Sequence, residues 1–154
     1  MAGIGFDGSV VERVGTARKK LLGKGAYLVS ALQQLMFWEQ EKLMIIGNGA
    51  ENKCHSIIIC NAAHYGGAFR LAPGADISSP LFEVICIRSD QRRAYLKLAI
   101  NVLTGKKIFQ EEIVRFTAQD ITVAGSKAIQ IDGDFFGHSP VTIRMVSDYA
   151  RVIV

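Results

Sequence analysis

The spacing of apolar residues changes near Phe37, and this change constrains the possible fold more than any other feature of the chain. From there on, runs rich in β-branched and aromatic residues alternate with turn-forming segments such as Gly47-Asn-Gly49 and Pro73-Gly74. Short runs of this kind, bounded by turn residues, are typical of β-strands. The predicted strands are Phe37–Ile46, Lys53–Ala62, Leu81–Arg88, Glu112–Thr122, Ala128–Ile131, Val141–Val146 and Ala150–Val154.

Helical spacing occurs in three places. After a short strand within residues 1–7, a first helix is predicted up to Leu22, with interruptions near Gly15 and Gly23. A second is predicted over 25–36, where apolar residues recur at i, i+3, i+4 and i+7. A third is predicted over 90–104, with Ser89 as its N-cap and Gly105 just beyond its end.

These elements predict a mainly β, α+β fold: a two-sheet β-sandwich with helices packed at one side or end. A chain of 154 residues with 49% apolar residues can bury one continuous core, so residues 1–154 are expected to form a single domain. The apolar terminal segment Arg151–Val154 is expected to pair with an earlier strand or with a partner domain.

The cysteines and the N-terminal segment indicate the cellular compartment of the protein. Cys54, Cys60 and Cys86 are odd in number and lie in apolar runs, as expected of buried free thiols in a reducing environment. Residues 1–7 lack the basic and apolar regions of a secretory signal, and no apolar run approaches the roughly 18 residues of a membrane span. We therefore predict a cytoplasmic protein, with peripheral contact to a membrane surface left open.

Basic residues cluster in two places although the net charge is only +4. One cluster runs from Arg13 through Arg18 to Lys24, and the other comprises Arg88, Arg92 and Arg93. Such clusters suit phosphates or anionic headgroups, and they are equally typical of a solvated helix face. Nucleic acid is not expected as a partner, because neither cluster has interleaved aromatic residues.

The segment Asp132-Gly133-Asp134 is the strongest candidate for chemistry. Phosphoryl transfer to an alcohol uses one carboxylate to orient or deprotonate the hydroxyl, and often another to hold Mg²⁺ through water. The alternative is a plain hairpin turn, because Asp-Gly is a common turn dipeptide. On this segment alone, the turn is the favoured interpretation.

A further acidic residue, Asp7, lies in Gly5-Phe-Asp-Gly8 and is expected in a turn directly before a helix. Backbone amides at such a position can hold an anion or a water-bridged metal, whereas an N-cap or Asx turn is the simpler explanation.

Other polar clusters predict no site. The glycine-rich stretch 61–67 lacks the spacing of a phosphate-binding P-loop. Cys60, His64 and His55 do not offer the four ligands of a structural zinc site and are expected to be structural.

Five segments, taken in order, resemble the C-terminal half of the diacylglycerol kinase and sphingosine kinase family of lipid kinases, including its bacterial soluble members. They are Gly3–Gly8, the basic stretch ending at Leu22–Tyr27, Asn61–Ala75, Leu81–Val84, and Ile131–Asp134 with Ser139-Pro140. Together they extend over nearly the whole chain.

The resemblance implies a lipid-binding domain that completes the active site of an ATP- and Mg²⁺-dependent lipid kinase. The family has an N-terminal nucleotide-binding domain with a Gly-Gly-Asp-Gly-Thr motif, which this sequence does not contain. That domain is expected to be the partner of this one, and the 154-residue chain alone is expected to be inactive.

By the same resemblance, Asp134 is the proton acceptor, and Asp132 and Gly133 lie near the nucleotide phosphates. Asp7 joins a water and Mg²⁺ network, and Arg18 lies near a basic position that contacts nucleotide phosphates.

Two departures from the family pattern leave other functions open. Asp134 stands where the family has a glutamate, and Ser79-Pro80 stands where it has an Asp-Gly whose aspartate binds a structural Mg²⁺ in bacterial members. One alternative is therefore a lipid-binding or regulatory module without catalysis, and another is an unrelated β-sandwich whose Asp-Gly turns are only turns.

Overall fold

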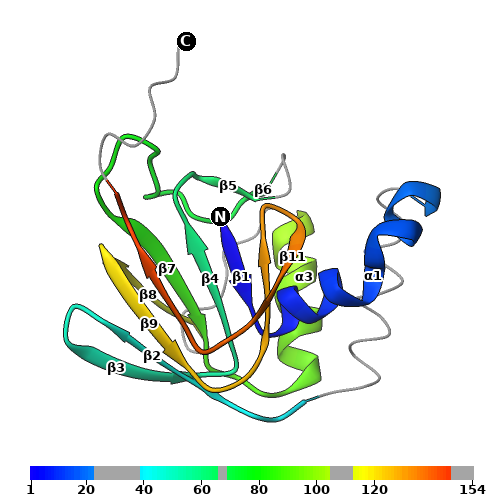
Figure 1. Cartoon of the computed structure of the whole chain (residues 1–154), viewed down its shortest axis with the longest axis horizontal. Helices are drawn as coiled ribbons and strands as arrows, with labels where there is room; N and C mark the ends of the chain where they lie inside the picture. Colours follow the sequence, from blue (N-terminus) through cyan, green and yellow to red (C-terminus); the bar gives the residue numbers. More distant parts are fainter. Residues whose placement is uncertain (23–38, 66–68, 105–112, 147–154) are drawn as a thin grey trace.

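The computed structural model describes residues 1–22, 39–65, 69–104 and 113–146 (Figure 1). Its strands form a six-stranded sheet in the order β11-β10-β1-β4-β7-β8, a four-stranded sheet in the order β12-β9-β2-β3, and a small β5-β6 ribbon. All strand pairs are antiparallel. The strands are β1 Ala2–Ile4, β2 Leu43–Gly47, β3 Ala50–Cys54, β4 Ser56–Cys60, β5 His64–Tyr65, β6 Phe69–Arg70, β7 Phe82–Ile87, β8 Ile113–Ala118, β9 Asp120–Ala124, β10 Ala128–Ile131, β11 Asp134–His138 and β12 Val141–Arg144.

The two larger sheets enclose the main core, which confirms the predicted sandwich. Alternate residues of a strand point to opposite faces, so β2 and β9 each contribute one buried face. Every residue of β4 is buried, because its second face is covered by the segment around Leu71 and Ala72. Side chains that are almost fully buried fill the space between the sheets: Ile4, Leu43, Ile45, Ile57, Ile59, Val84, Ile121, Val123 and Ile129.

The chain crosses from one sheet to the other at two places where the sequence shows unbroken strand character. The predicted strand Lys53–Ala62 is divided at His55, so that β3 belongs to the smaller sheet and β4 to the larger. The predicted strand Glu112–Thr122 is divided at Gln119 in the same way. Both single-strand predictions were wrong, because a one-residue corner between sheets interrupts neither the apolar content nor the β propensity.

Helix α1, Phe6–Leu22, begins earlier than predicted and continues through Gly15. Gly5 has a φ of 95° and its carbonyl accepts the Ser9 amide, so the helix starts at the next residue. Asp7 therefore lies in the first turn of the helix, and the expectation of a turn preceding the helix was wrong. The helix packs on β10 so closely that a Cβ on Gly8 would lie 2.0 Å from the Ala128 carbonyl oxygen.

Helix α3, Arg92–Thr104, confirms the third predicted helix, although it begins at Arg92 rather than Asp90. Both helices lie on the side of the molecule that carries β1, β10 and β11 (Figure 1). Neither of these described helices is long and apolar enough to span a membrane. The predicted helix over 25–36, Gly105 and the predicted terminal strand over 150–154 fall outside the described residues.

Two further differences concern the start of one predicted strand and the presence of a strand that was not predicted. In the described part of Phe37–Ile46, residues 39–42 are not in a strand and β2 begins at Leu43. Strand β11 was not predicted, since its exposed residues Asp-Phe-Phe-Gly-His show no alternation. The three cysteines are buried free thiols, as expected.

Candidate functional site

Asp132 and Gly133 form the two-residue loop of the β10–β11 hairpin, in which Ile131 pairs with Asp134. Their φ angles are 49° and 88°, the left-handed conformations of a type I′ turn. Asp-Gly suits this turn because both residues tolerate positive φ. The turn interpretation is therefore correct for the backbone, and the same turn presents two exposed carboxylates, with the Asp132 side chain 74% exposed.

Gln130 connects this turn to Asp7. Its Nε2 donates to Asp7 Oδ2 over 2.7 Å, and its Oε1 accepts the Gly133 amide, also over 2.7 Å. Gln130 is only 2% exposed and Asp7 is half-buried. Two acidic segments that are more than 120 residues apart in the sequence thus meet through one buried amide.

The contact between Asp7 and Gln130 depends on a glycine in β1. A Cβ on Gly3 would lie 2.0 Å from Asp7 Oδ2 and 2.8 Å from Gln130 Nε2. Because real Cβ atoms do not approach other atoms so closely, any larger residue would displace one of these two groups. Gly3 therefore leaves the space in which the carboxylate and the amide meet.

A buried polar cluster holds the start of α1, and with it the backbone of Asp7. The Phe6 amide donates to Ser56 Oγ over 3.0 Å, and the Tyr95 hydroxyl donates to the same oxygen over 2.6 Å. His55 Nδ1 lies 2.6 Å from the Tyr95 hydroxyl, and its Nε2 lies 2.6 Å from the Glu39 carbonyl oxygen. Burial lowers the pKa of His55, which favours the neutral imidazole in this cluster.

The hairpin is also tied to β1. The Asp132 amide donates to the Met1 carbonyl oxygen over 3.1 Å, and Asp132 Oδ1 lies 2.7 Å from the Met1 amino nitrogen. These contacts fix the position of the turn relative to the strand that leads to Asp7.

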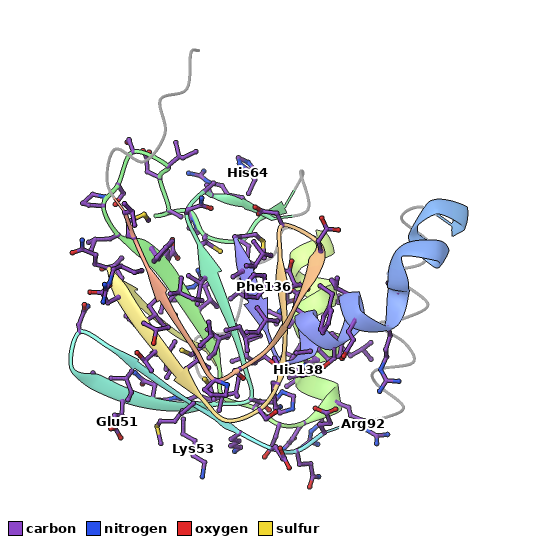
Figure 2. The ribbon with its side chains drawn as sticks, in the orientation of Figure 1. Glu51, Lys53, His64, Arg92, Phe136 and His138 are labelled. Carbon is purple, nitrogen blue, oxygen red and sulfur yellow. The ribbon has the colours of Figure 1, made fainter. Side chains whose placement is uncertain are left out.

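Strand β11 carries a β-bulge next to the turn. Gln130 pairs with Phe135 and Ile129 with Gly137, which leaves Phe136 without a partner in the ladder. Bulges frequently re-aim a side chain. The Phe136 ring is 65% exposed and lies on the strand that begins with Asp134 (Figure 2).

The described residues of the two basic clusters lie in α1 and at or just before α3. Arg18 lies in α1, but its side chain is outside the described residues, so its predicted role stays a prediction. Arg88, Arg92 and Arg93 are exposed, in keeping with a solvated surface.

Two other polar residues considered from the sequence, Cys60 and His55, are buried. Burial raises the pKa of the Cys60 thiol to about 11, so this thiol stays protonated near neutral pH. His55 belongs to the cluster around Ser56. In the described part of the chain, no three His, Cys, Asp or Glu side chains converge as ligands of a metal ion. Carboxylates such as that of Asp7 nevertheless suit Mg²⁺, which is commonly held by one or two carboxylates while water and phosphate supply the other oxygens.

The loop with the Ser79-Pro80 departure is closed by hydroxyl contacts. Asp76 Oδ1 accepts the amide and the hydroxyl of Ser78 over 2.8 Å and 2.7 Å, and these bonds lower the pKa of Asp76. Ser79 Oγ accepts the Leu81 amide over 3.2 Å. Ser79, whose hydroxyl closes this turn, thus occupies the position at which the family that the sequence resembles has a metal-binding aspartate.

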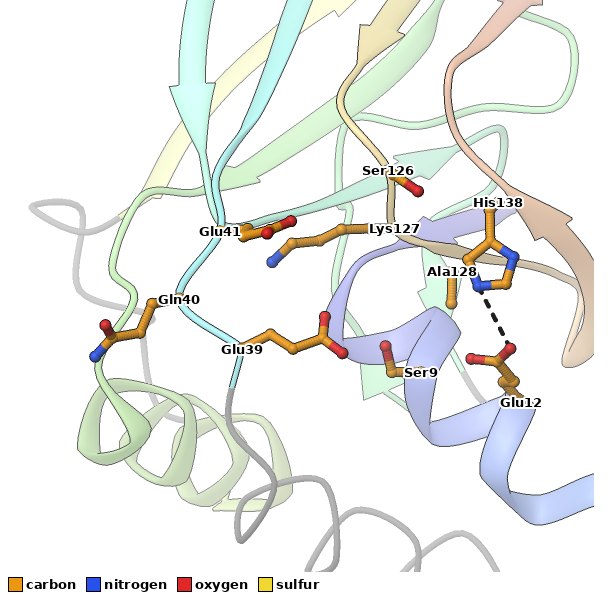
Figure 3. A pocket seen from close by; sticks show the side chains of 9 residues that line it. All are labelled: Ser9, Glu12, Glu39, Gln40, Glu41, Ser126, Lys127, Ala128 and His138. Carbon is orange, nitrogen blue, oxygen red and sulfur yellow. Dashed lines mark ion pairs between the residues drawn. The ribbon is translucent and has the colours of Figure 1, made fainter.

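A pocket of about 550 Å³ lies at the opposite end of β10, at Ala128 and Lys127 (Figure 3). Glu12, Glu39 and Glu41 line it, and His138 Nε2 lies 3.4 Å from Glu12 Oε1. Burial lowers the pKa of Lys127, whose Nζ donates to the His55 carbonyl oxygen over 3.1 Å. The three carboxylates make this pocket unsuitable for phosphate groups.

The family model for the YegS C-terminal NAD kinase beta sandwich-like domain matches residues 1–154. The chain belongs to this family. This match confirms the resemblance to lipid kinases that was drawn from the five segments. The beta sandwich in the family's description corresponds to the two larger sheets of this structure.

Known proteins similar to this one are longer. A crystal structure of a diacylglycerol kinase from Bacillus anthracis str. Sterne matches with a TM-score of 0.61 and 21% identity, over 95% of this chain and 48% of that chain. Another, of a protein provisionally assigned as a diacylglycerol kinase from the same strain, matches with a TM-score of 0.64 and 19% identity, over 95% and 49%. An uncharacterized protein of Synechocystis sp. is 24% identical over 94% of this chain and 35% of its own length. The chain thus spans about half or less of these relatives, and at these identities the solved structures establish the fold.

The candidates named from the sequence were Asp7, Asp132, Gly133 and Asp134, and Gln130 was not among them. The available signal was the strand pattern itself: a glutamine between Ile129 and Ile131 occupies a position that faces the packed helix. Its exact partners depend on the pairing of β10 with β1, which local sequence does not specify.

Proposed function

We propose that this domain completes the active site of an ATP-dependent lipid kinase, which transfers the γ-phosphoryl group of ATP to the hydroxyl of a diacylglycerol or sphingoid lipid. The observation that carries the proposal is the assembly of Asp7 and the Asp132–Asp134 hairpin through Gln130. Membership of a kinase-related family supports it. The nucleotide would be held by an N-terminal domain, in keeping with the greater length of the related structures.

Asp134 is assigned as the base. Its exposed carboxylate accepts the proton of the lipid hydroxyl, the hydroxyl oxygen forms a bond to the γ-phosphorus, and the bond to the bridging oxygen of ADP breaks. Mg²⁺ supplies charge neutralisation at the phosphates when bound. Asp7 and Asp132 would hold its waters, and the Gly133 backbone would lie beside the phosphates.

The exposed aromatic rings after Asp134 suit the apolar part of a lipid. Phe135 and Phe136 are 45% and 65% exposed and follow the proposed base directly. A lipid whose hydroxyl reaches Asp134 would therefore pass over apolar surface. The space between the sheets does not suit an acyl chain, since core side chains such as Ile57 and Val123 already fill it.

The test is Asp134→Asn in the complete kinase, assayed with ATP, Mg²⁺ and diacylglycerol in mixed micelles. We expect phosphorylation to fall by at least about 100-fold with the thermal midpoint unchanged, since a positioned base contributes roughly 10² to 10⁴ in rate. Asp120→Asn is the matched control, because Asp120 is an exposed carboxylate paired with Arg144 on the smaller sheet. A fully active Asp134→Asn enzyme would end the assignment.

The second candidate is a lipid-binding module without catalysis, favoured by Ser79 and its turn contact where the family has a metal-binding carboxylate. It predicts lipid binding by the chain that does not depend on ATP or Mg²⁺. Asp134→Glu separates the two candidates: restoring the family's longer side chain should preserve or raise kinase activity, whereas a module without catalysis stays inactive.

A further inference from the structure

The buried side chain of Gln130 contacts both acidic segments of the proposed site. It lies in β10, which is flanked by β1 and β11, and it is 2% exposed. We propose that Gln130 is a positioning residue, which fixes the Asp7 carboxylate relative to the Asp132–Asp134 hairpin. This role rests on the proposed kinase function.

The two ends of the Gln130 side-chain amide bind different partners. Nε2 donates to Asp7 Oδ2 and Oε1 accepts the Gly133 amide, each over 2.7 Å. An amide is both a donor and an acceptor, whereas an ionised carboxylate only accepts and a thioether does neither well. Glutamine is therefore the residue that can satisfy both neighbours at neutral pH.

The geometry of the neighbours leaves little freedom. Asp7 Oδ2 is confined by the backbone of Gly3, and Gly133 is confined by its φ of 88° in the two-residue turn. Asp7 is also held through the first turn of α1, which begins with the bond from the Phe6 amide to Ser56. Gln130 links these two anchored parts, so its loss would remove the contact that sets the Asp7 carboxylate relative to the Gly133 backbone.

A small displacement of this kind is sufficient to affect catalysis. An error of about 1 Å at a reacting centre can cost on the order of 100-fold in rate. Asp134 is the first residue of β11 and follows Gly133 directly, so movement of the turn moves the proposed base. Gln130 acts through Asp7 and Gly133, and it does not itself touch the lipid or the nucleotide in this assignment.

The first variant is Gln130→Met, which keeps the length of the side chain and removes both hydrogen bonds. In the complete kinase we expect kcat to fall by roughly 10- to 100-fold, with KM for ATP and for diacylglycerol within about twofold. Gln119→Met is the matched control, because Gln119 is exposed at the corner between β8 and β9. In the 154-residue chain, amide hydrogen exchange at Gly133 should accelerate in Gln130→Met and stay unchanged in Gln119→Met.

The second variant, Gln130→Glu, separates positioning from general damage. Its protonated form can donate to Asp7 Oδ2 and accept from Gly133, while its ionised form repels Asp7. The titratable groups of the two acidic segments, Asp7, Asp132 and Asp134, are the same in both enzymes. The ratio of kcat in Gln130→Glu to kcat in wild type should therefore rise as the pH is lowered from 8 to 5.5, by up to about tenfold per pH unit, whereas the ratio for Gln130→Met should stay flat.

The outcomes are distinct. A wild-type kinase with no activity overturns the proposed function, and the positioning role with it. An active wild type together with an active Gln130→Met variant overturns the positioning role alone. A loss of kcat in both variants with a flat pH ratio for Gln130→Glu also overturns it, since a structural defect would not be repaired by a proton. A rising ratio supports it.

Discussion

Two hairpin turns of this protein have nearly the same backbone and very different surroundings. Asn48-Gly49 joins β2 to β3 with φ angles of 52° and 74°, and Asp132-Gly133 joins β10 to β11 with φ angles of 49° and 88°. Both are two-residue loops of the kind that Asn-Gly and Asp-Gly favour. The local sequence therefore specifies both turns equally well.

The two turns differ in the residues that contact them. A Cβ on Gly49 would meet nothing within 4 Å, and the Asn48 side chain reaches only the Thr117 carbonyl oxygen on the surface. The Gly133 amide is held by Gln130, which also holds Asp7. The Asp132-Gly133 turn is a candidate site because the buried Gln130 side chain connects it to Asp7. Variants at the two turns and at Gly3 can test this difference.

Among the variants that test this comparison, the largest effect is expected for Gly3→Ala. The new Cβ would lie 2.0 Å from Asp7 Oδ2 and 2.8 Å from Gln130 Nε2, so the Asp7 carboxylate must rotate away from the Gln130 amide. We expect kcat of the complete kinase to fall on the order of 100-fold, with a loss of roughly 1–3 kcal/mol in the free energy of unfolding, because the buried Gln130 amide loses its partner. Steady-state kinetics and thermal unfolding measure the two quantities.

Gly47→Ala is the control for this prediction. Gly47 ends β2 in the smaller sheet, and its Cβ would lie 2.8 Å from the Phe116 ring of β8 in the larger sheet, so this variant should lower stability and leave kcat of the folded enzyme unchanged. If Gly3→Ala kept the wild-type kcat, the contact between Asp7 and Gln130 would not matter for the reaction.

A smaller effect is expected from Gly133→Ala compared with Gly49→Ala. Each places a Cβ on a left-handed residue, which costs roughly 1–2 kcal/mol of stability. Urea denaturation should therefore show similar losses for the two variants. Only Gly133→Ala should also lower kcat, by about tenfold, because it strains the turn that carries Asp134. Equal kcat values in both variants would remove the distinction between the turns.

Only part of the fold could be predicted from the sequence. Strands, turns and the third helix follow from local patterns, since alternation and Gly-containing dipeptides act over a few residues. The corners at His55 and Gln119 were missed, because a strand that changes sheet keeps its apolar character. Strand β11 was missed because it is an exposed edge strand with a bulge at Phe136.

The candidate site was predictable in part. Asp7 and Asp132–Asp134 were identified from their residue types and from the order of family-like segments, but their proximity depends on the pairing of β1 with β10. This pairing joins segments that are more than 120 residues apart, and no local pattern encodes it. Gln130 becomes visible only once that pairing places its amide between Asp7 and Gly133.

The smallest expected effect is that of Asn48→Asp, which gives the first turn the same Asp-Gly dipeptide as the second. Aspartate tolerates the left-handed conformation nearly as well as asparagine, and only an exposed hydrogen bond to Thr117 is lost. We expect the free energy of unfolding to change by less than about 0.5 kcal/mol and kcat to stay the same, whereas Asp132→Asn, the reverse exchange at the other turn, should lower kcat several-fold. Urea denaturation and kinase assays measure both variants. If Asn48→Asp altered kcat as much as Asp132→Asn, the activity would respond to surface charge in general, and the contacts of Gln130 would no longer distinguish one Asp-Gly turn from the other.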